Sequence, residues 1–460
     1  YAVLFYLWRD AAPGRAFKLG LLYGIASFGA GLYWVYISIH EFGEVDIALT
    51  LLLTGGLVAI LSLFVAATGW AAAKWLRTRG AFAWLGMLPA LFVLTEWCRG
   101  WLFSGFGWLS AGYSQTDSWL FGLAPVLGLH GMSWLVLLTA GSLVTLVLGS
   151  NRERLAAAVL AAVLWAGAFG LGRVAWTRPT GEPLKAALVQ GAVPQELKWQ
   201  PDELGATMML YRRLTEASAG SRLIVWPEAA IPTLYGYIPS YIETLKSWAA
   251  AHHSVILLGI LRGTPEDFQN SVVALPDTHE VYVKHHLVPF GEYFPVPRFV
   301  RNWLRLMSLP YLDAEPGPAD QPPLAAAGQR IGVSICYEDV FGEEQIRYIP
   351  KATLLVNVSN DAWFGDSIAP PQHLQISQLR AAEAGRYLLR ATNTGITAVI
   401  GPKGQVLARL PQFQPGTLES KVTGMQGATP YARWGNYPVV IGALLLVLLP
   451  PLVTRLKRRR

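Results

Sequence analysis

The sequence predicts a multi-span α-helical membrane bundle joined to an α/β domain. Hydrophobic residues make up 53% of the 460 residues and charged residues only 15%, which departs from soluble proteins in the direction of membrane proteins. Several stretches of about 20 residues contain almost no charge, and this is the length that crosses a bilayer. From about residue 180 to 430, short β-branched runs instead alternate with stretches of helical period.

The apolar stretches predict the membrane helices in chain order. Tyr1–Trp8 resembles the end of a span, so we expect upstream sequence to be missing. The complete spans are expected at about 17–39, 48–71, 82–103, 127–149 and 154–173, with a last one at about 437–455.

The basic residues between these spans predict the topology. They occupy alternate loops: Arg9, Arg15 and Lys18, then Lys74, Arg77 and Arg79, then Arg152 and Arg154. Loops 40–47 and 104–126 hold no Lys or Arg. The positive-inside rule makes the basic loops cytoplasmic, so residues 180–430 are expected outside the cytoplasmic membrane and the tail Arg455–Arg460 inside. Topology thus accounts for much of the net charge of +7, and nucleic-acid binding is not expected.

The segment from 180 to 430 reads as a layered α/β domain with a covered sheet. Helices are expected at about 202–218, 239–252 and 371–390. Strands are expected at Leu184–Val193, Arg222–Pro227, Ser254–Leu261, Asn270–Leu275, Val281–Leu287, Arg330–Cys336 and Ala352–Val358. Near-continuous apolar strands alternating with helices are typical of this architecture.

Three of these strands end at a side chain capable of chemistry: Glu228, Lys284 and Cys336. Strand ends line ligand sites in α/β folds, so we expect the three to face one cleft. Taken singly, each has a structural explanation, because a lone cysteine is usually a small buried hydrophobe and a lone glutamate after proline a turn or cap residue. The second cysteine, Cys98, lies in a predicted span, so a disulfide framework is not expected.

Together the three residues form a catalytic set. A free thiol has a pKa of about 8.5 and is a poor nucleophile until it ionises. Glu228 would accept the thiol proton of Cys336 as general base. Lys284 would stabilise the thiolate and then the oxyanion, with the backbone N–H of Tyr337 as a second oxyanion donor.

The residues around this set resemble a known superfamily. WPE at 226–228, KHHLVPFGE at 284–292 and CYE at 336–338 resemble the signature segments of the nitrilase, or carbon–nitrogen hydrolase, superfamily. The run Asn357–Gly404, with VSNDAWFGDS and PQHLQ, is similar to the bacterial apolipoprotein N-acyltransferases. WCRGWLFSGFGWLSAGYSQ at 97–115 and VQGAVPQELKW at 189–199 resemble the same family. The extra histidine in His285-His286 is a departure to which the sequence assigns no role.

The resemblance implies an αββα sandwich and a ping-pong acyl transfer without a cofactor. The acyl chain of a glycerophospholipid, typically phosphatidylethanolamine, would pass through a cysteine thioester to the α-amino group of the N-terminal diacylglyceryl-cysteine of a lipoprotein. The catalytic triad would be Glu228, Lys284 and Cys336, with Glu292 as a supporting carboxylate, Tyr337 and Glu338 shaping the site, and Trp199 as a substrate contact.

The resemblance also implies where the protein acts. We expect a monomer in the bacterial inner membrane with its catalytic domain in the periplasm. The domains expected are membrane helices over 1–176, a nitrilase-like domain over 183–425, and a C-terminal helix with a basic cytoplasmic tail over 433–460.

Two aromatic segments, Tyr235–Tyr241 and Phe299–Tyr311, have two interpretations. They are either internal packing or interfacial arms that line a path for the acyl chain. Asp361, Trp363 and Phe364 either line the acyl site or brace their loop. His373 is expected at the surface or in a cap, with ligand binding as the alternative. The substrate-contact candidates are Trp199, Tyr235, Trp303, Leu304, Leu306 and Trp363.

Other chemistries lack their motifs. No G-x-S-x-G elbow or H-E-x-x-H motif occurs in the sequence, and the adjacent pairs His252-His253 and His285-His286 lack ligand spacing. Two alternatives remain open: a membrane-tethered amidase that uses water as acceptor, and a catalytically dead lipid-binding protein. The apolar spans argue against the amidase and the complete Glu228/Lys284/Cys336 set against the binder.

Overall fold

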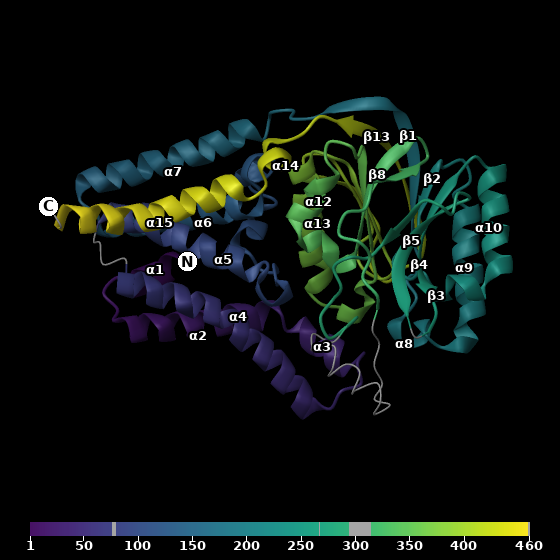
Figure 1. Ribbon diagram of the computed structural model, residues 1–460, viewed down its shortest axis with the longest axis horizontal. Coiled ribbons are helices and arrows are strands. Elements are labelled where there is room, and N and C mark those ends of the chain that lie inside the picture. The colour runs from purple at the N-terminus through teal and green to yellow at the C-terminus, as the bar shows by residue number, and fades with distance from the viewer. Residues whose placement is uncertain (76–79, 266, 294–313, 459–460) are drawn as a thin grey trace. The chain divides into compact units, whose positions relative to one another are not determined.

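The computed structural model describes residues 1–75, 80–265, 267–293 and 314–458, with side chains as far as residue 448. The chain forms two compact units (Figure 1). Unit 1 consists of Tyr1–Trp176, Asp366–Ala369 and Thr429–Arg460, and unit 2 consists of Thr177–Gly365 and Pro370–Ala428.

Unit 1 is helical. Its helices are α1 (Ala2–Trp8), α2 (Pro13–Gly31), α3 (Trp34–His40), α4 (Ile47–Trp75), the π-helix η1 (Ala83–Met87), α5 (Leu88–Arg99), α6 (Ala124–Leu148), α7 (Asn151–Leu171), α14 (Pro430–Trp434) and α15 (Tyr437–Arg458). Short 3-10 turns η2 (Leu102–Ser104), η3 (Ala111–Gln115) and η4 (Trp119–Leu123) lie between α5 and α6. Within the described residues, three helices are long and apolar enough to cross a membrane: Ile47–Trp75, Trp119–Leu148 and Asn151–Leu171.

The predicted spans at 48–71, 127–149 and 154–173 are confirmed as helices, and two others differ. The span expected at 17–39 breaks at Leu32, whose backbone leaves the helical region (φ −123°, ψ 17°), and α2 and α3 meet at 60°. The segment expected at 82–103 is continuously helical only over residues 81–99, where the π-helical η1 runs directly into α5. In the C-terminal span, Tyr437–Leu448 is a shorter apolar helix within α15.

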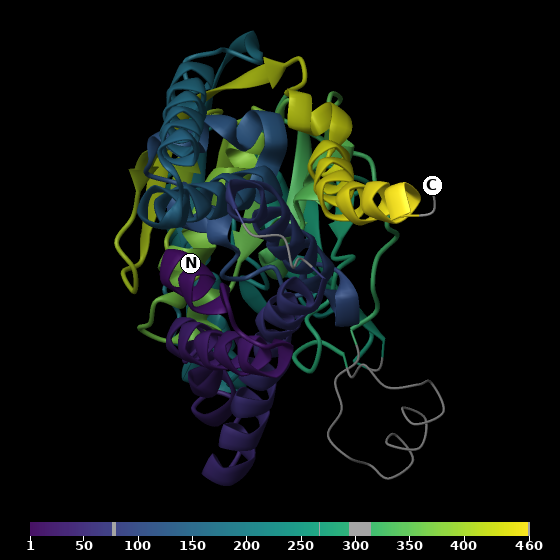
Figure 2. The same cartoon turned by 90° about the vertical axis from the view of Figure 1, so that its left-hand side faces the viewer.

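Helices α2 and α4 lie side by side, as both views show (Figures 1 and 2). Glycine makes this approach possible. A Cβ atom at Gly20 would lie 2.7 Å from the Val65 carbonyl oxygen, and one at Gly24 would lie 2.7 Å from the Ser62 Cα. Small residues at such positions are typical of helix packing in membranes.

Two charged residues of α5 are buried in unit 1. Glu96 accepts hydrogen bonds from the Ser133 hydroxyl and, at 2.9 Å, from the Ala111 N–H. Arg99 donates at 2.6 Å to the carbonyl oxygens of Phe106 and Trp108. The two charges therefore satisfy the backbone of the non-helical segment that follows α5.

Unit 2 contains two mixed β-sheets. The seven-stranded sheet has the order β13-β1-β2-β4-β5-β6, with β3 paired to β4, and the six-stranded sheet has the order β12-β11-β10-β9-β8-β7. The first sheet comprises β1 (Arg178–Gln190), β2 (Leu223–Val225), β3 (Ile231–Leu234), β4 (Val255–Gly263), β5 (Phe268–Leu275), β6 (Val281–Val283) and β13 (Gly416–Gln426). The second comprises β7 (Leu324–Ala326), β8 (Gln329–Ile335), β9 (Leu354–Ser359), β10 (Leu388–Thr392), β11 (Ala398–Ile400) and β12 (Val406–Arg409).

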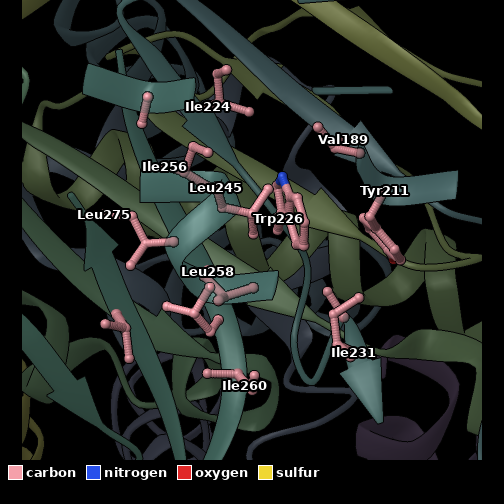
Figure 3. Packing of buried hydrophobic residues seen from close by; sticks show 14 of the residues in the cluster. Val189, Tyr211, Ile224, Trp226, Ile231, Leu245, Ile256, Leu258, Ile260 and Leu275 are labelled. Atoms are coloured by element: carbon pink, nitrogen blue, oxygen red, sulfur yellow. The ribbon is translucent and has the colours of Figure 1, made fainter. Parts of the chain in front are cut away.

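Helices cover the outer face of each sheet, so unit 2 has four layers (Figure 1). Helices α9 (Leu204–Glu216) and α10 (Pro239–Ala251) pack on the seven-stranded sheet through a cluster centred on Trp226 (Figure 3). The indole N–H of Trp226 donates to the Thr215 hydroxyl of α9 at 3.0 Å. Helix α13 (Ala369–Ala384), beside the short α12 (Gly342–Gln345), lies on the six-stranded sheet. The predicted αββα sandwich is confirmed.

Sequence periodicity placed α9 and α10 well but extended the third helix too far. The helix expected at 371–390 ends at Ala384 because Gly385 takes a positive φ of 62°. Leu388 already begins β10, which the sequence assigned to the helix. The antiparallel strands β11, β12 and β13 were not predicted, and the first two are short.

Candidate active site

The three predicted residues end strands of two different sheets. Glu228 follows β2 and Lys284 follows β6 in the seven-stranded sheet, whereas Cys336 follows β8 in the six-stranded sheet. A hydrogen bond connects the two sheets here, because the N–H of Asn360, just after β9, donates to Glu228 Oε2 at 2.9 Å. The strand endings thus meet across the sandwich rather than along one sheet.

Lys284 lies between two carboxylates. Its Nζ is 3.2 Å from Glu228 Oε1 and 2.7 Å from Glu292 Oε1, and its side chain is 1% exposed. Burial alone would lower the pKa of Lys284, but Glu228 and Glu292 together raise it above its ordinary value. The lysine is therefore a permanent buried cation, and Glu292 lies beside it as expected.

The Glu228 carboxylate is held in place by three donors. Besides Lys284 and the Asn360 N–H, the Asn270 amide donates to Oε1 at 2.7 Å. The backbone carbonyl of Glu228 accepts a hydrogen bond from the buried Lys198 Nζ at 3.3 Å. The three donors orient the carboxylate, and Lys198 fixes the backbone that carries it.

Cys336 has a left-handed backbone conformation, with φ of 53°, at the start of the 3-10 turn η7 (Cys336–Val340). This region is rarely adopted by non-glycine residues. Burial and the nearby Glu228 charge raise the pKa of the Cys336 thiol well above its usual value, and Lys284 only partly opposes them. The thiol is therefore protonated at rest, and any reaction of the sulfur as a nucleophile would require removal of this proton.

Glu338 connects the strand that precedes Cys336 to the strand that precedes Lys284. It is 1% exposed and accepts hydrogen bonds from the Tyr282 hydroxyl and from the N–H groups of His285, His286 and Ile335, all at 2.7–3.1 Å. Burial raises its pKa to about 7, although the backbone donors act in the opposite direction. Glu338 thus braces the site, and Tyr337 lies between it and Cys336.

The histidine pair beside Lys284 makes separate contacts. His285 Nδ1 lies 2.8 Å from the Gly317 carbonyl oxygen. His286 Nδ1 lies 3.2 Å from Glu344 Oε1, and its ring stacks on Phe341 at 3.6 Å. Both rings therefore hold neighbouring segments together.

The proposed substrate contacts separate into exposed, packed and undescribed residues. Trp199 and Trp363 are 47% and 40% exposed. Tyr235 packs against the core of the seven-stranded sheet, as does Tyr241 of the same aromatic segment. Trp303, Leu304 and Leu306, with the whole of Phe299–Tyr311, lie outside the described residues. Among the residues that are described, no cluster of three or more His, Cys, Asp or Glu could hold a metal ion.

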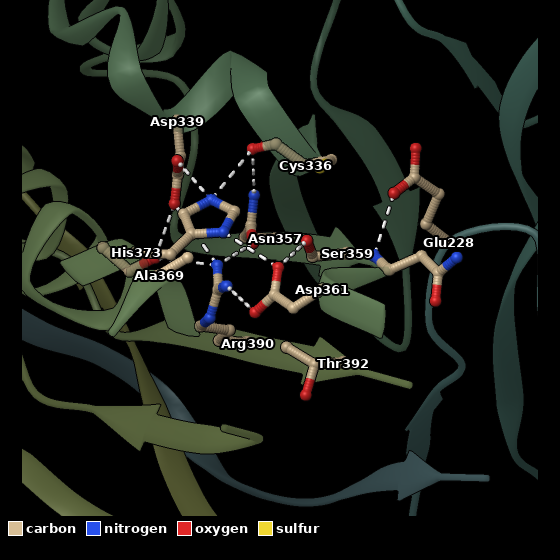
Figure 4. A network of polar contacts seen from close by, with 12 residues as sticks. Glu228, Cys336, Asp339, Asn357, Ser359, Asp361, Ala369, His373, Arg390 and Thr392 are labelled. Atoms are coloured by element: carbon tan, nitrogen blue, oxygen red, sulfur yellow. Dashed lines mark hydrogen bonds and ion pairs between the residues drawn. The ribbon is translucent and has the colours of Figure 1, made fainter. Parts of the chain in front are cut away.

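His373 is not at the surface or in a cap, so that expectation is wrong. Its side chain is 0% exposed and lies between Asp339 and Asp361, at 3.0 and 2.9 Å (Figure 4). Asp361 also accepts hydrogen bonds from the Ser359 hydroxyl at 2.7 Å and from Arg390 at 2.8 Å, so this aspartate braces its loop.

Similarity to known proteins identifies the family of this chain. A family model for the N-terminal domain of apolipoprotein N-acyltransferase matches residues 1–142, and the carbon–nitrogen hydrolase model matches residues 185–431. An apolipoprotein N-acyltransferase of Nitrosomonas europaea is 46% identical over 454 residues, covering 97% of this chain and 90% of that protein. One of Methylococcus capsulatus is 42% identical over 442 residues, covering 95% of this chain and 88% of that protein. The chain belongs to the apolipoprotein N-acyltransferase family.

Solved structures similar to this apolipoprotein N-acyltransferase family member include a nitrilase-superfamily amidase of Nesterenkonia AN1. It is 20% identical, with a TM-score of 0.40, over 55% of this chain and 95% of that chain. The C. elegans NitFhit protein is 16% identical, with a TM-score of 0.42, over 60% of this chain and 65% of that chain.

Several residues of the site in this family member were missed from the sequence. Asn270, Asn357 and Arg390 are buried polar residues of β5, β9 and β10, strands whose buried positions are mostly apolar. A buried polar group requires a partner, so a polar residue in the middle of a covered strand is the signal that could have indicated them. Lys198 was missed because it precedes Trp199 in a polar segment that looks solvated.

Proposed function

We propose that this acyltransferase moves an acyl chain from a glycerophospholipid through a thioester on Cys336 to the α-amino group of the N-terminal diacylglyceryl-cysteine of a lipoprotein. One observation carries the assignment of the residues: the buried Lys284 lies 3.2 Å from Glu228 and 2.7 Å from Glu292, and both Glu228 and Lys284 act on the Cys336 thiol electrostatically. Family membership supports the reaction class.

In the first half-reaction, Glu228 accepts the Cys336 proton while the sulfur attacks the ester carbonyl of the phospholipid. The oxyanion formed is stabilised by the Lys284 ammonium, with the Tyr337 N–H as second donor. Collapse of the intermediate breaks the ester C–O bond, and protonated Glu228 returns the proton to the glycerol oxygen. Lysophospholipid leaves, and the acyl group remains on sulfur.

In the second half-reaction, the neutral α-amine attacks the thioester carbonyl. Glu228 accepts a proton from the attacking nitrogen, and the same oxyanion donors act again. The C–S bond breaks and the thiolate takes a proton from Glu228, which yields the amide and the free thiol. The resting enzyme also has a protonated thiol, so each catalytic cycle returns Cys336 to its starting state.

Two exposed aromatic residues close in sequence to the catalytic groups are assigned a role in binding the substrate. Trp199 follows Lys198, which donates to the Glu228 carbonyl. Trp363 lies three residues after Asn360, whose N–H binds Glu228. An acyl chain gains about 0.8 kcal/mol per buried CH₂, so aromatic surface beside the nucleophile favours a lipid over a small amide. Tyr235 is better explained by internal packing.

The family and the apolar helices make the chain a bacterial membrane protein. For its orientation we infer the inner membrane with residues 180–430 in the periplasm, on the basis of the alternating basic loops. Donor and acceptor would then both reach the site from the outer leaflet.

Product analysis tests the reaction directly. The detergent-solubilised enzyme, given phosphatidylethanolamine and a synthetic diacylglyceryl-cysteinyl peptide, is expected to form lysophospholipid and N-acylated peptide in equal amounts by mass spectrometry. Free fatty acid in place of acylated peptide would indicate the amidase-like alternative. Recovery of both substrates unchanged would indicate the lipid-binding alternative.

A further inference from the structure

A buried network of charged side chains adjoins Cys336 and has no part in the proton transfers described above. Its four charged members are Asp339, Asp361, His373 and Arg390, each no more than 1% exposed (Figure 4). They come from four elements: η7, the 3-10 turn η9 (Asp361–Phe364), α13 and β10. A group of charges this deep is maintained only when each has partners.

The contacts of His373 favour its charged form. Its Nδ1 lies 2.9 Å from Asp361 Oδ1 and its Nε2 lies 3.0 Å from Asp339 Oδ1. An ionised carboxylate accepts hydrogen bonds and cannot donate them, so this placement favours hydrogen on both ring nitrogens, which makes the ring an imidazolium. Burial and Arg390 would lower the pKa of His373, but Asp339 and Asp361 raise it to about 9.

Arg390 completes the balance of charge. Its guanidinium lies 2.8 Å from Asp361 Oδ2 and 3.4 Å from Asp339 Oδ2. Two carboxylates therefore face two cations. Asp339 on η7, Asp361 on η9 and Arg390 on β10 are the charged groups of the described structure seen to contact His373 or its partners, so loss of the histidine proton leaves two carboxylates facing one cation.

The network contacts the nucleophile at its backbone. His373 Nε2 lies 3.3 Å from the Cys336 carbonyl oxygen, and the Asn357 amide donates to the same oxygen at 3.4 Å. Asn357 is in turn held by Arg390 at 2.5 Å. Asp339 belongs to the same 3-10 turn as Cys336. The carbonyl of Cys336 and the turn that follows it are thus both fixed.

We propose that His373 is a positioning residue: as an imidazolium between Asp339 and Asp361, it holds Cys336 in the left-handed conformation from which the thiol reacts. A left-handed non-glycine residue persists only where its surroundings determine it, and the contacts at the Cys336 carbonyl provide this restraint. The inference rests on the proposed function only for the choice of Cys336 as nucleophile.

The test measures acylation of Cys336 by p-nitrophenyl acetate, a small ester that needs no lipid site, in the full-length enzyme in detergent. His373→Gln keeps a polar side chain but carries no charge, and we expect acylation about 100-fold slower with little change in KM. The wild-type rate is expected to fall as the pH rises through about 9, and the variant to lack that decline. His252→Gln, at an exposed ring stacked on Trp248, is the matched control and should behave as wild type.

A second measurement does not depend on whether the variant folds. In ¹⁵N-histidine NMR of the wild-type enzyme, one ring should keep both N–H protons up to about pH 9. The loss of this doubly protonated signal should coincide with the fall in the acylation rate. Acylation that stays constant while this signal disappears would overturn the proposal. So would a folded His373→Gln enzyme with the wild-type rate and pH profile. Normal ester acylation without transfer from phospholipid would instead count against the proposed function alone.

Discussion

The two cysteines of the chain lie in contrasting surroundings. Cys98, in α5, has charged residues on both sides in sequence, but Glu96 and Arg99 form their hydrogen bonds with the segment that follows the helix and with Ser133. Around Cys336 the charges converge instead: Glu228 and Lys284 act on the thiol, and His373 and Asn357 lie at its carbonyl oxygen. Charge beside a cysteine is therefore informative only when the partners of that charge are known.

Replacing Cys336 is expected to have the largest effect on activity, and replacing Cys98 is expected to have none. Cys336→Ser should reduce transfer below detection, because a hydroxyl is far harder to ionise than a thiol. Cys98→Ala should retain wild-type activity. Mass spectrometry of each protein after incubation with phospholipid gives the answer, and an acyl adduct that persists in Cys336→Ser would contradict the assignment.

Removing the proposed general base is expected to have the next largest effect on the rate of acylation. Glu228→Gln keeps the shape of the side chain but cannot accept a proton, so acyl-enzyme formation should slow by about 10²- to 10⁴-fold. Glu243→Gln, in an exposed pair with Lys246, is the control. Stopped-flow acylation with p-nitrophenyl acetate measures both, and equal rates in the two variants would exclude Glu228 as the base.

Lys284→Met separates catalysis from stability. Loss of one oxyanion donor should slow acylation by about 10²- to 10³-fold. The two carboxylates left in the buried site should also lower the free energy of unfolding by about 3–5 kcal/mol. Lys246→Met, which breaks only an exposed pair, should cost less than about 1 kcal/mol. If both variants unfold at the same denaturant concentration, Lys284 does not lie between buried carboxylates.

Glu338 predicts a pH dependence of stability. Its pKa in the folded protein is about 7, above the ordinary value of 4.5, so the folded state binds the proton more tightly than the unfolded state. The corresponding stability is complete below pH 4.5 and is lost as the pH rises through 7, by up to about 3 kcal/mol. Denaturant titrations at several pH values measure this, and Glu338→Gln should remove the slope. If Glu338→Gln keeps the wild-type dependence of unfolding free energy on pH, that dependence belongs to another group.

The smallest effect is expected at the exposed aromatic contact. Trp199→Ala should raise KM for phospholipid about tenfold, equivalent to about 1.4 kcal/mol of lost apolar contact, with little change in acylation by p-nitrophenyl acetate. Met209→Ala, at another exposed apolar side chain of unit 2, is the control. An unchanged KM in Trp199→Ala would place lipid binding elsewhere.

The sequence predicted the parts of the fold that depend on local pattern. Long apolar runs such as α4 and α7 follow from hydropathy, and Glu228, Lys284 and Cys336 follow from strand endings and a family resemblance. Tertiary contacts decide the rest. The break at Leu32 and the helix end at Gly385 depend on single backbone conformations. The burial of His373 could not be predicted, because its partners Asp339 and Asp361 come from separate turns that only the folded sandwich brings together.

The lifetime of the acyl-enzyme tests the central claim most directly. After a single turnover with phosphatidylethanolamine, the protein is separated from excess lipid, and the thioester on Cys336 is followed by intact-protein mass spectrometry in buffer, with or without diacylglyceryl-cysteinyl peptide. The account predicts an adduct that persists in buffer and disappears when the peptide is added, with N-acylated peptide as product. An adduct that hydrolyses equally fast with and without peptide would contradict transfer to an amine.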